Sequence, residues 1–189
     1  ADNILGCSEH KKWRDECVSS SITLVKDTQK LLPVSPETHQ RVLLIQSTPV
    51  AFFGPPEELH FRDYLEDAGF EVTMMAEDIF PSPDFFDLVI YLVNQTRFFG
   101  RGSYFADWQD LHRGLMKSMM RTWDSIPTMM ISLSNPYHLF DAPRVKTYIN
   151  AYSPIESVQK KLVELITGKA AFKGTNPVDP FCGLDDAKL

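Results

Sequence analysis

Two acidic and two basic side chains in one segment, residues 94 to 110, have types suited to chemistry. The segment reads NQTRFFGRGSYFADWQD and contains Arg97, Arg101, Asp107 and Asp110, but no Glu. Arg97 and Arg101 flank a Phe-Phe-Gly turn and suit either bidentate binding of a carboxylate or phosphate, or a solvated or domain-bridging position. Asp107 and Asp110 fall within an expected helix, where acidic residues near the amino end usually stabilise the helix dipole.

A second group of candidates follows an expected strand at residues 127 to 133. Asn135, Tyr137 and His138 come after its carboxyl end, the edge where ligands of open α/β sheets usually approach. We therefore take them as candidate ligand-binding or cleft-lining residues. The structural alternative stays open, because tyrosines commonly pack with a satisfied hydroxyl and a lone histidine is commonly structural.

Metal and cofactor sites are not indicated. Cys7, Cys17 and Cys182 lack CxxC spacing and have no accompanying histidine cluster, so we expect free thiols, no metal, and a reducing compartment such as the bacterial cytoplasm. The turn at Gly54 is not a glycine-rich phosphate loop, so no cofactor is expected either.

Elements of two kinds alternate along the chain and must position these residues. Apolar runs predict strands at residues 41–46, 70–74, 87–93, 127–133 and 147–151, and helical stripes predict helices at residues 8–26, 57–68, 104–123 and 156–167. This alternation predicts an α/β fold, a three-layer α/β/α domain around a doubly wound parallel sheet of about five strands. We divide the chain into a connector helix and linker (1–36), the α/β domain (37–168) and an extended tail (169–189).

Charge and hydropathy exclude two classes of partner. The formal charge of −6 and the pI near 5.3 argue against nucleic acid. No apolar run reaches the roughly 18 residues of a membrane helix, and the amino end has neither an initiator Met nor a signal-peptide pattern. The sequence thus reads as a piece of a longer chain without a membrane partner.

Three phrases resemble one protein family in the right order. They are SITLVKDTQKLLPVSPETHQRVLLI (21–45), IPTMMISLSNPYHLFDAPRVKTYINAYS (126–153) and VQKKLVELITGKAAFKGTNPVD (158–179). Together they resemble the carboxy-terminal domain of family 3 glycoside hydrolases, of the β-N-acetylhexosaminidase-like type. The resemblance implies a flavodoxin-like sheet of strand order 2-1-3-4-5, docked beside an amino-terminal (β/α) barrel. Residues 8–26 then belong to the connection between the two domains.

The resemblance also implies a division of the catalytic groups between domains. The family's nucleophilic Asp lies on the barrel, so we assign no catalytic residue to this chain and expect it to be inactive alone. The acid is a Glu of the second domain in β-glucosidase-like members and a His-Asp pair of the barrel in N-acetylglucosaminidase-like members. The absence of Glu from residues 94–110 favours the second type.

The expected activity of the whole protein is therefore removal of terminal β-linked N-acetylglucosamine from a carbohydrate substrate. Two alternatives stay open. One is a β-glucosidase or β-xylosidase of the same family whose second domain supplies the acid. The other is a non-catalytic flavodoxin-like binding module, although residues 46–49 after the first expected strand offer no carboxylate of the kind receiver domains gather there.

Overall fold

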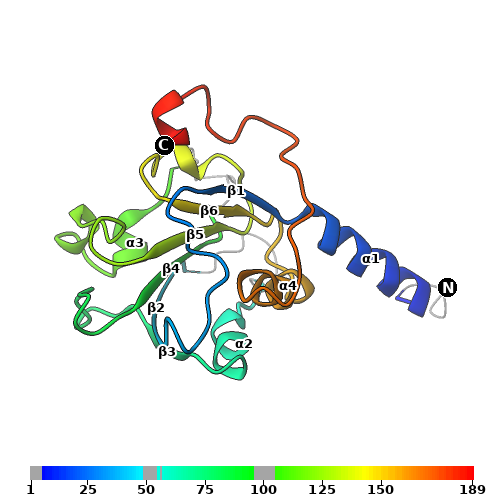
Figure 1. Cartoon of the computed structure of the whole chain (residues 1–189), viewed down its shortest axis with the longest axis horizontal. Helices are drawn as coiled ribbons and strands as arrows, with labels where there is room; N and C mark the ends of the chain where they lie inside the picture. The colour runs from blue at the N-terminus through cyan, green and yellow to red at the C-terminus, as the bar shows by residue number, and fades with distance from the viewer. Residues whose placement is uncertain (1–5, 49–54, 56, 96–104) are drawn as a thin grey trace.

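The computed structural model describes residues 6–48, 55, 57–95 and 105–189, and these form one mixed sheet of six strands flanked by helices (Figure 1). The strands are β1 (Thr23–Asp27), β2 (Arg41–Gln46), β3 (Glu71–Met74), β4 (Leu88–Val93), β5 (Thr128–Ser132) and β6 (Thr147–Asn150). Their order is β1-β6-β5-β4-β2-β3, parallel except for β1. The predicted α/β fold with five parallel strands in flavodoxin-like order is confirmed, and β1 is added to it.

The helices cover both faces of the sheet. The α-helices are α1 (Ser8–Ser21), α2 (Phe61–Asp67), α3 (Trp108–His112) and α4 (Glu156–Ile166), and the 3-10 helices are η1 (Lys117–Met119), η2 (His138–Phe140) and η3 (Asp185–Lys188). Figure 1 shows α2 and α4 on one side of the strands and α3 on the other, which gives the three predicted layers. Among the described residues, no helix is long and apolar enough to cross a membrane.

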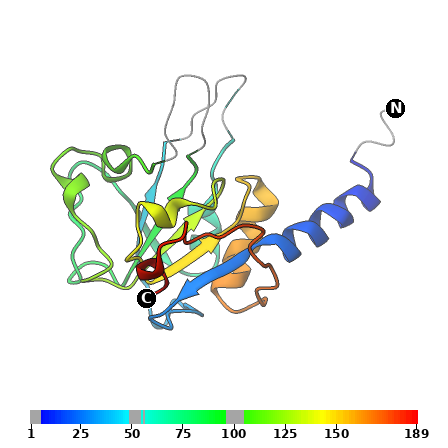
Figure 2. The ribbon, with the colours of Figure 1, turned by 90° about the horizontal axis from the view of Figure 1, so that it is seen from above.

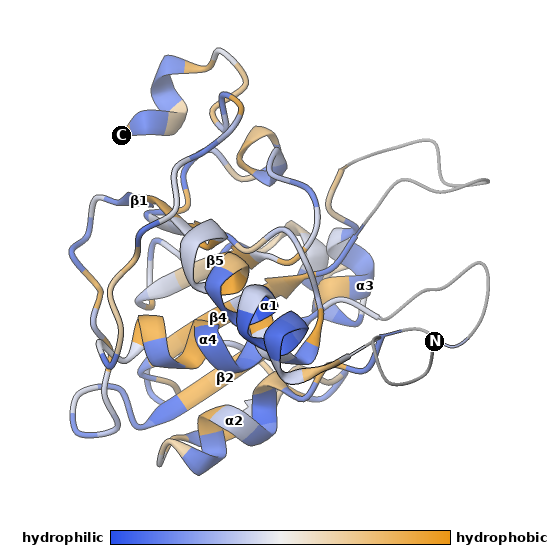
Figure 3. Ribbon diagram, turned by 90° about the vertical axis from the view of Figure 1, so that its right-hand side faces the viewer, coloured by the Kyte–Doolittle hydropathy of each residue, from blue (hydrophilic) through white to orange (hydrophobic). Residues whose placement is uncertain are grey.

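The central strands send alternate side chains into two cores. In β4, Leu88, Ile90 and Leu92 join the core beneath α2 and α4, whereas Val89, Tyr91 and Val93 join the core on the side of α3. All six residues of β4 are buried, as expected for a parallel strand covered on both faces. Figure 3 shows the resulting hydrophobic strands, and it also shows that α1 is largely hydrophilic.

The helix predicted for residues 8–26 is too long. It ends at Ser21, Ile22 is extended (φ −63°, ψ 124°), and β1 follows, paired antiparallel with β6. The reason lies in the side-chain period: Leu24 packs against one core and Val25 against the other, which is the two-residue alternation of a strand. The residues predicted as connector therefore contribute a strand to the sheet.

The long helix predicted for residues 104–123 is also wrong. It is limited to α3, because Arg113 adopts a left-handed conformation (φ 52°) and ends the helix, and only the short η1 follows. Leu115 and Met119 of the expected buried stripe are 65% and 69% exposed. Contacts of the Arg113 side chain, described below, account for this early end.

The tail after α4 is mostly irregular and ends in η3. Lys26 of β1 is buried, and its Nζ donates to the carbonyl oxygens of Pro143 at 3.0 Å and Ala187 at 2.7 Å. Burial lowers the pKa of Lys26, while the charge of Asp186 acts in the opposite direction. These bonds attach the end of the chain to the edge strand β1.

Candidate functional site

The carboxyl ends of the parallel strands place polar side chains along one edge of the sheet. Gln46 ends β2, Asn94 and Gln95 follow β4, Asn135 follows β5, and Asn150 ends β6. Because parallel strands end at a common edge, the segments that follow β2, β4 and β5 start side by side. We refer to this region as the carboxyl edge.

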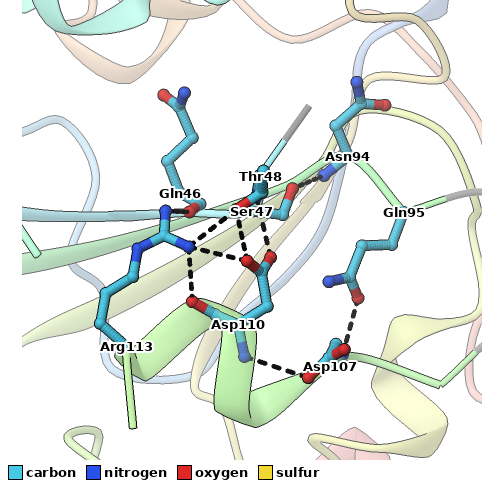
Figure 4. Close-up of polar contacts among 8 residues, drawn as sticks. All are labelled: Gln46, Ser47, Thr48, Asn94, Gln95, Asp107, Asp110 and Arg113. Carbon is cyan, nitrogen blue, oxygen red and sulfur yellow. Dashed lines mark hydrogen bonds and ion pairs between the residues drawn. The ribbon is translucent and has the colours of Figure 1, made fainter. Parts of the chain in front are cut away.

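Asp110 of α3 links the carboxyl edge to the helix (Figure 4). Its carboxylate accepts a hydrogen bond from the Thr48 backbone N–H at 2.8 Å and another from the Thr48 hydroxyl. Arg113 Nη1 lies 2.7 Å from Asp110 Oδ1, and Arg113 Nη2 donates to the carbonyl oxygen of Gln46 at 3.0 Å. The Asp110 carboxylate is the acceptor in the contacts with Thr48 and Arg113, and it acts as a structural anion between β2 and α3.

Asp107 begins α3. Its Oδ1 accepts from the Asp110 backbone N–H at 3.0 Å, which makes it the N-cap of the helix. Its own backbone N–H donates to Gln95 Oε1 at 2.7 Å. Both acidic residues of the 94–110 segment thus make contacts that shape the start of α3, in line with the helix-terminal role expected from the sequence.

Asn135 and Tyr137 form a tight turn after β5. Asn135 Oδ1 accepts from the Tyr137 backbone N–H at 2.9 Å, an Asx turn, and the Ser132 hydroxyl donates to the Asn135 carbonyl oxygen. Asn135 is buried, whereas Tyr137 is 41% exposed. Of the candidate residues placed by the structure, Tyr137 alone presents a large side-chain surface to solvent.

His138, the next residue, starts η2 and is fully buried. Neither ring nitrogen has a hydrogen-bond partner among the described residues. Burial lowers the pKa of His138 to about 4, so the ring is neutral at pH 7. His138 therefore lies beneath the turn that carries Tyr137. The other two candidates, Arg97 and Arg101, lie outside the described residues.

Several polar residues of the carboxyl edge were missed by the sequence analysis, and Gln95 is the clearest. Its Oε1 is occupied by the Asp107 N–H, so its Nε2 is a buried donor without a partner among the described residues. Asn135 Nδ2 is in the same situation, because Asn135 Oδ1 is likewise occupied. The sequence did contain a signal for these residues: a carboxamide side chain lies at or shortly after the end of each apolar run that forms β2, β4, β5 or β6.

The described residues contain no group of three or more His, Cys, Asp or Glu side chains arranged to hold a metal ion. The carboxyl edge instead offers neutral amides, hydroxyls and one ion pair, Asp110–Arg113, whose charged groups already bind each other. Such groups suit the binding of neutral hydroxylated molecules and do not form a nucleophile with an adjacent base.

Two of the known proteins that match this chain are similar over its whole length or nearly so. The chain is 34% identical to a "Beta-N-acetylglucosaminidase/beta-glucosidase" of Cellulomonas fimi over 205 residues, which cover 100% of this chain and 36% of that protein. The solved structure of a "Beta-glucoside phosphorylase BglX" shares 38% identity with a TM-score of 0.80, covering 98% of this chain and 34% of the other. The chain thus spans about a third of the length of these relatives.

A third match supports the fold. The structure of a glycoside hydrolase family 3 β-N-acetylglucosaminidase from Paenibacillus sp. str. FPU-7 has a TM-score of 0.63 at 19% identity, covering 90% of this chain and 32% of that one. No protein family model matches the chain. From the two full-span matches and the shared fold, this chain belongs to glycoside hydrolase family 3, as its carboxy-terminal α/β domain.

Proposed function

We propose that this chain is the accessory domain of a retaining enzyme that removes terminal β-linked N-acetylglucosamine, with the nucleophile and the acid on an amino-terminal (β/α) barrel. The observation that carries the proposal is the set of acidic residues in the 94–110 segment and the contacts that they make. It has no Glu, and its two carboxylates, Asp107 and Asp110, cap and anchor α3. A second domain that supplied the acid would need a carboxyl group free to protonate the leaving oxygen.

The proposal explains how a two-group mechanism divides between domains. A retaining glycosidase requires a nucleophile on one side of the glycosidic bond and a proton donor on the other. With both on the barrel, this domain contributes its carboxyl edge to the rim of the substrate cleft. Tyr137 is our first candidate for contact with sugar, because it combines an exposed aromatic ring with a hydroxyl.

Two names among the relatives bear on the substrate. The 34% identical protein is named for both N-acetylglucosaminides and glucosides. The 38% identical structure is named a phosphorylase, which favours a second candidate reaction. In it, a phosphate oxygen attacks the anomeric carbon of the glycosyl-enzyme, the bond to the nucleophile breaks, and a sugar 1-phosphate leaves. Arg97 and Arg101 are candidates for binding that phosphate.

The test uses the full-length enzyme with 4-nitrophenyl β-N-acetylglucosaminide and 4-nitrophenyl β-glucoside. We expect Asp107→Asn to retain kcat within about threefold of wild type on the better substrate. A fall on the order of a thousandfold with the fold preserved, rescued by azide, would mean that this domain supplies the acid. Assays with and without phosphate, with detection of sugar 1-phosphate, separate transfer to phosphate from hydrolysis.

A further inference from the structure

The tail passes close to the junction of α1 and β1 at Gly174. We call this junction, residues 21 to 23, the root of α1. A Cβ placed on Gly174 would lie 2.5 Å from the Ile22 carbonyl oxygen and the Thr23 hydroxyl, and closer still to the Ser21 carbonyl oxygen. Such separations are far below van der Waals contact. Because Gly174 does not have a positive φ, its backbone conformation is open to any residue. The space at the root of α1, and not the backbone angle, is what requires glycine here.

The tail is anchored on both sides of this crossing. Two residues before it, Phe172 packs against the core beneath α4. Two residues after it, Asn176 Oδ1 accepts from Tyr152 Oη at 3.0 Å and from Asn150 Nδ2 at 3.3 Å. Figure 1 shows this tail rising from the end of α4 past the junction of α1 and β1. The tail is thus held on both sides of the crossing, and a side chain added at Gly174 would press against the root of α1.

Among the described residues, α1 also contacts α4, but few of its own side chains are buried. Val18 is its one buried residue, and Trp13 is 52% exposed. A groove of about 620 Å³ is lined by Arg14 and Ser19 of α1 and by Lys161 of α4. Figures 1 and 2 show the helix projecting from the body of the domain. Its 14 residues span about 21 Å, so a small rotation at the root becomes a large displacement at the far end.

We propose that Gly174 is a positioning residue: by letting the tail cross the root of α1 without a side chain, it sets the direction in which α1 leaves the domain. The inference rests on the proposed function in one respect, namely that α1 leads to the barrel. The tail then determines how the carboxyl edge is presented to the cleft of the barrel, although no tail residue need touch substrate.

The direct test measures the direction of α1. Spin labels are placed at Lys11→Cys and Asp67→Cys in the chain with Cys7, Cys17 and Cys182 replaced by Ser, and the distance is measured by pulsed electron paramagnetic resonance. We expect Gly174→Ala to shift the mean distance by roughly 3 Å, since Lys11 lies about 16 Å from the root. Gly114→Ala is the matched control, because a Cβ there meets no atom within 4 Å and its φ is not positive either.

An unchanged distance in folded Gly174→Ala would overturn the proposal. If that variant does not fold, Asn176→Ala removes one anchor without adding volume. It should broaden the distance distribution, and an unaltered distribution would equally overturn the proposal.

The second test measures catalysis by the full-length enzyme. Gly174→Ala should lower kcat/KM by between about tenfold and a hundredfold, while Gly114→Ala should not change it. An unchanged kcat/KM despite a shifted distance would overturn the positioning role. Inactivity of the wild-type enzyme on both glycosides would instead contradict the proposed function, and the distance measurement would still decide whether Gly174 directs α1.

Discussion

Asp110 connects two parts of the carboxyl edge, because it binds Thr48, two residues after β2, and Arg113, which ends α3. We predict that Asp110→Asn lowers the free energy of unfolding by about 1 kcal/mol, since an amide replaces the anion beside Arg113 and the site is partly exposed. Urea unfolding measures this change. Asp124→Asn, at an exposed position with no polar side-chain partner in the described part of the chain, is the control, and equal losses in the two variants would contradict the assigned role.

His138 gives the domain a specific response to acid. Its pKa is lowered by burial to about 4, from an ordinary value of 6.5. Between those two values the unfolded chain binds a proton that the folded chain does not, so stability is fully present above pH 6.5 and falls as the pH drops toward 4.

We therefore predict that His138→Phe flattens the dependence of unfolding free energy on pH in this window, by at most about 1.4 kcal/mol per pH unit. Urea unfolding at a series of pH values measures the slope. If the slope is the same with and without the histidine, His138 becomes protonated without unfolding of the chain.

Residue-level inference from the sequence nominated segments but could not separate the buried from the exposed members within them. Asn135, Tyr137 and His138 are consecutive or nearly so, yet one turn buries two of them and exposes the third. The turn conformation depends on the Asx hydrogen bond of Asn135, which no pattern of residue types reveals. The same holds for Gln95, whose importance follows from the position of α3 relative to β4.

At the scale of elements, the parallel strands were predictable because burial on both faces makes them short apolar runs. The errors arose where a long-range contact overrode a local pattern. Residues 23–27 continue an apparent helical stripe, but pairing with β6 satisfies their backbone as a strand. The stripe over residues 104–123 is interrupted where Arg113 turns to bind the carbonyl oxygen of Gln46, far away in sequence.

The attachment of the tail to β1 gives a prediction at this scale. Lys26→Met leaves the carbonyl oxygens of Pro143 and Ala187 without their donor, which should cost about 1–3 kcal/mol. The amide protons of Ala187 and Leu189 in and after η3 should then exchange faster with deuterium. Lys188→Met is the control, since Lys188 forms an exposed pair with Asp185 and lies 5.9 Å from the centre of the Phe181 ring, and it does not bond to Pro143 or Ala187 among the described residues. Unchanged exchange in Lys26→Met would show that the tail is held without this lysine.

At the scale of the whole molecule, the chain spans about a third of the length of its relatives, and our proposal assigns the complete reaction to a larger protein. The sequence phrases identified the family because they run through the whole domain in order. They do not decide between N-acetylglucosaminide and glucoside, because that choice depends on groups which contact the sugar. Under our proposal those groups lie mainly on the barrel, and the carboxyl edge of this domain forms one wall of the cleft.

The last prediction concerns that wall. In the full-length enzyme, we expect Arg97→Gln or Arg101→Gln to raise the KM for the glycoside about two- to fivefold with kcat nearly unchanged. The reason is our proposal that these arginines line the rim of the cleft, where a residue contributes equally to binding of substrate and transition state. If phosphate is the acceptor, the KM for phosphate should rise more than the KM for the glycoside, since a guanidinium binds phosphate through two parallel hydrogen bonds. Steady-state kinetics with each substrate varied in turn distinguishes the two.

Arg144→Gln, on the segment between β5 and β6, is the control. A large fall in kcat at constant KM would place Arg97 or Arg101 in the chemical step and would contradict a cleft-lining role.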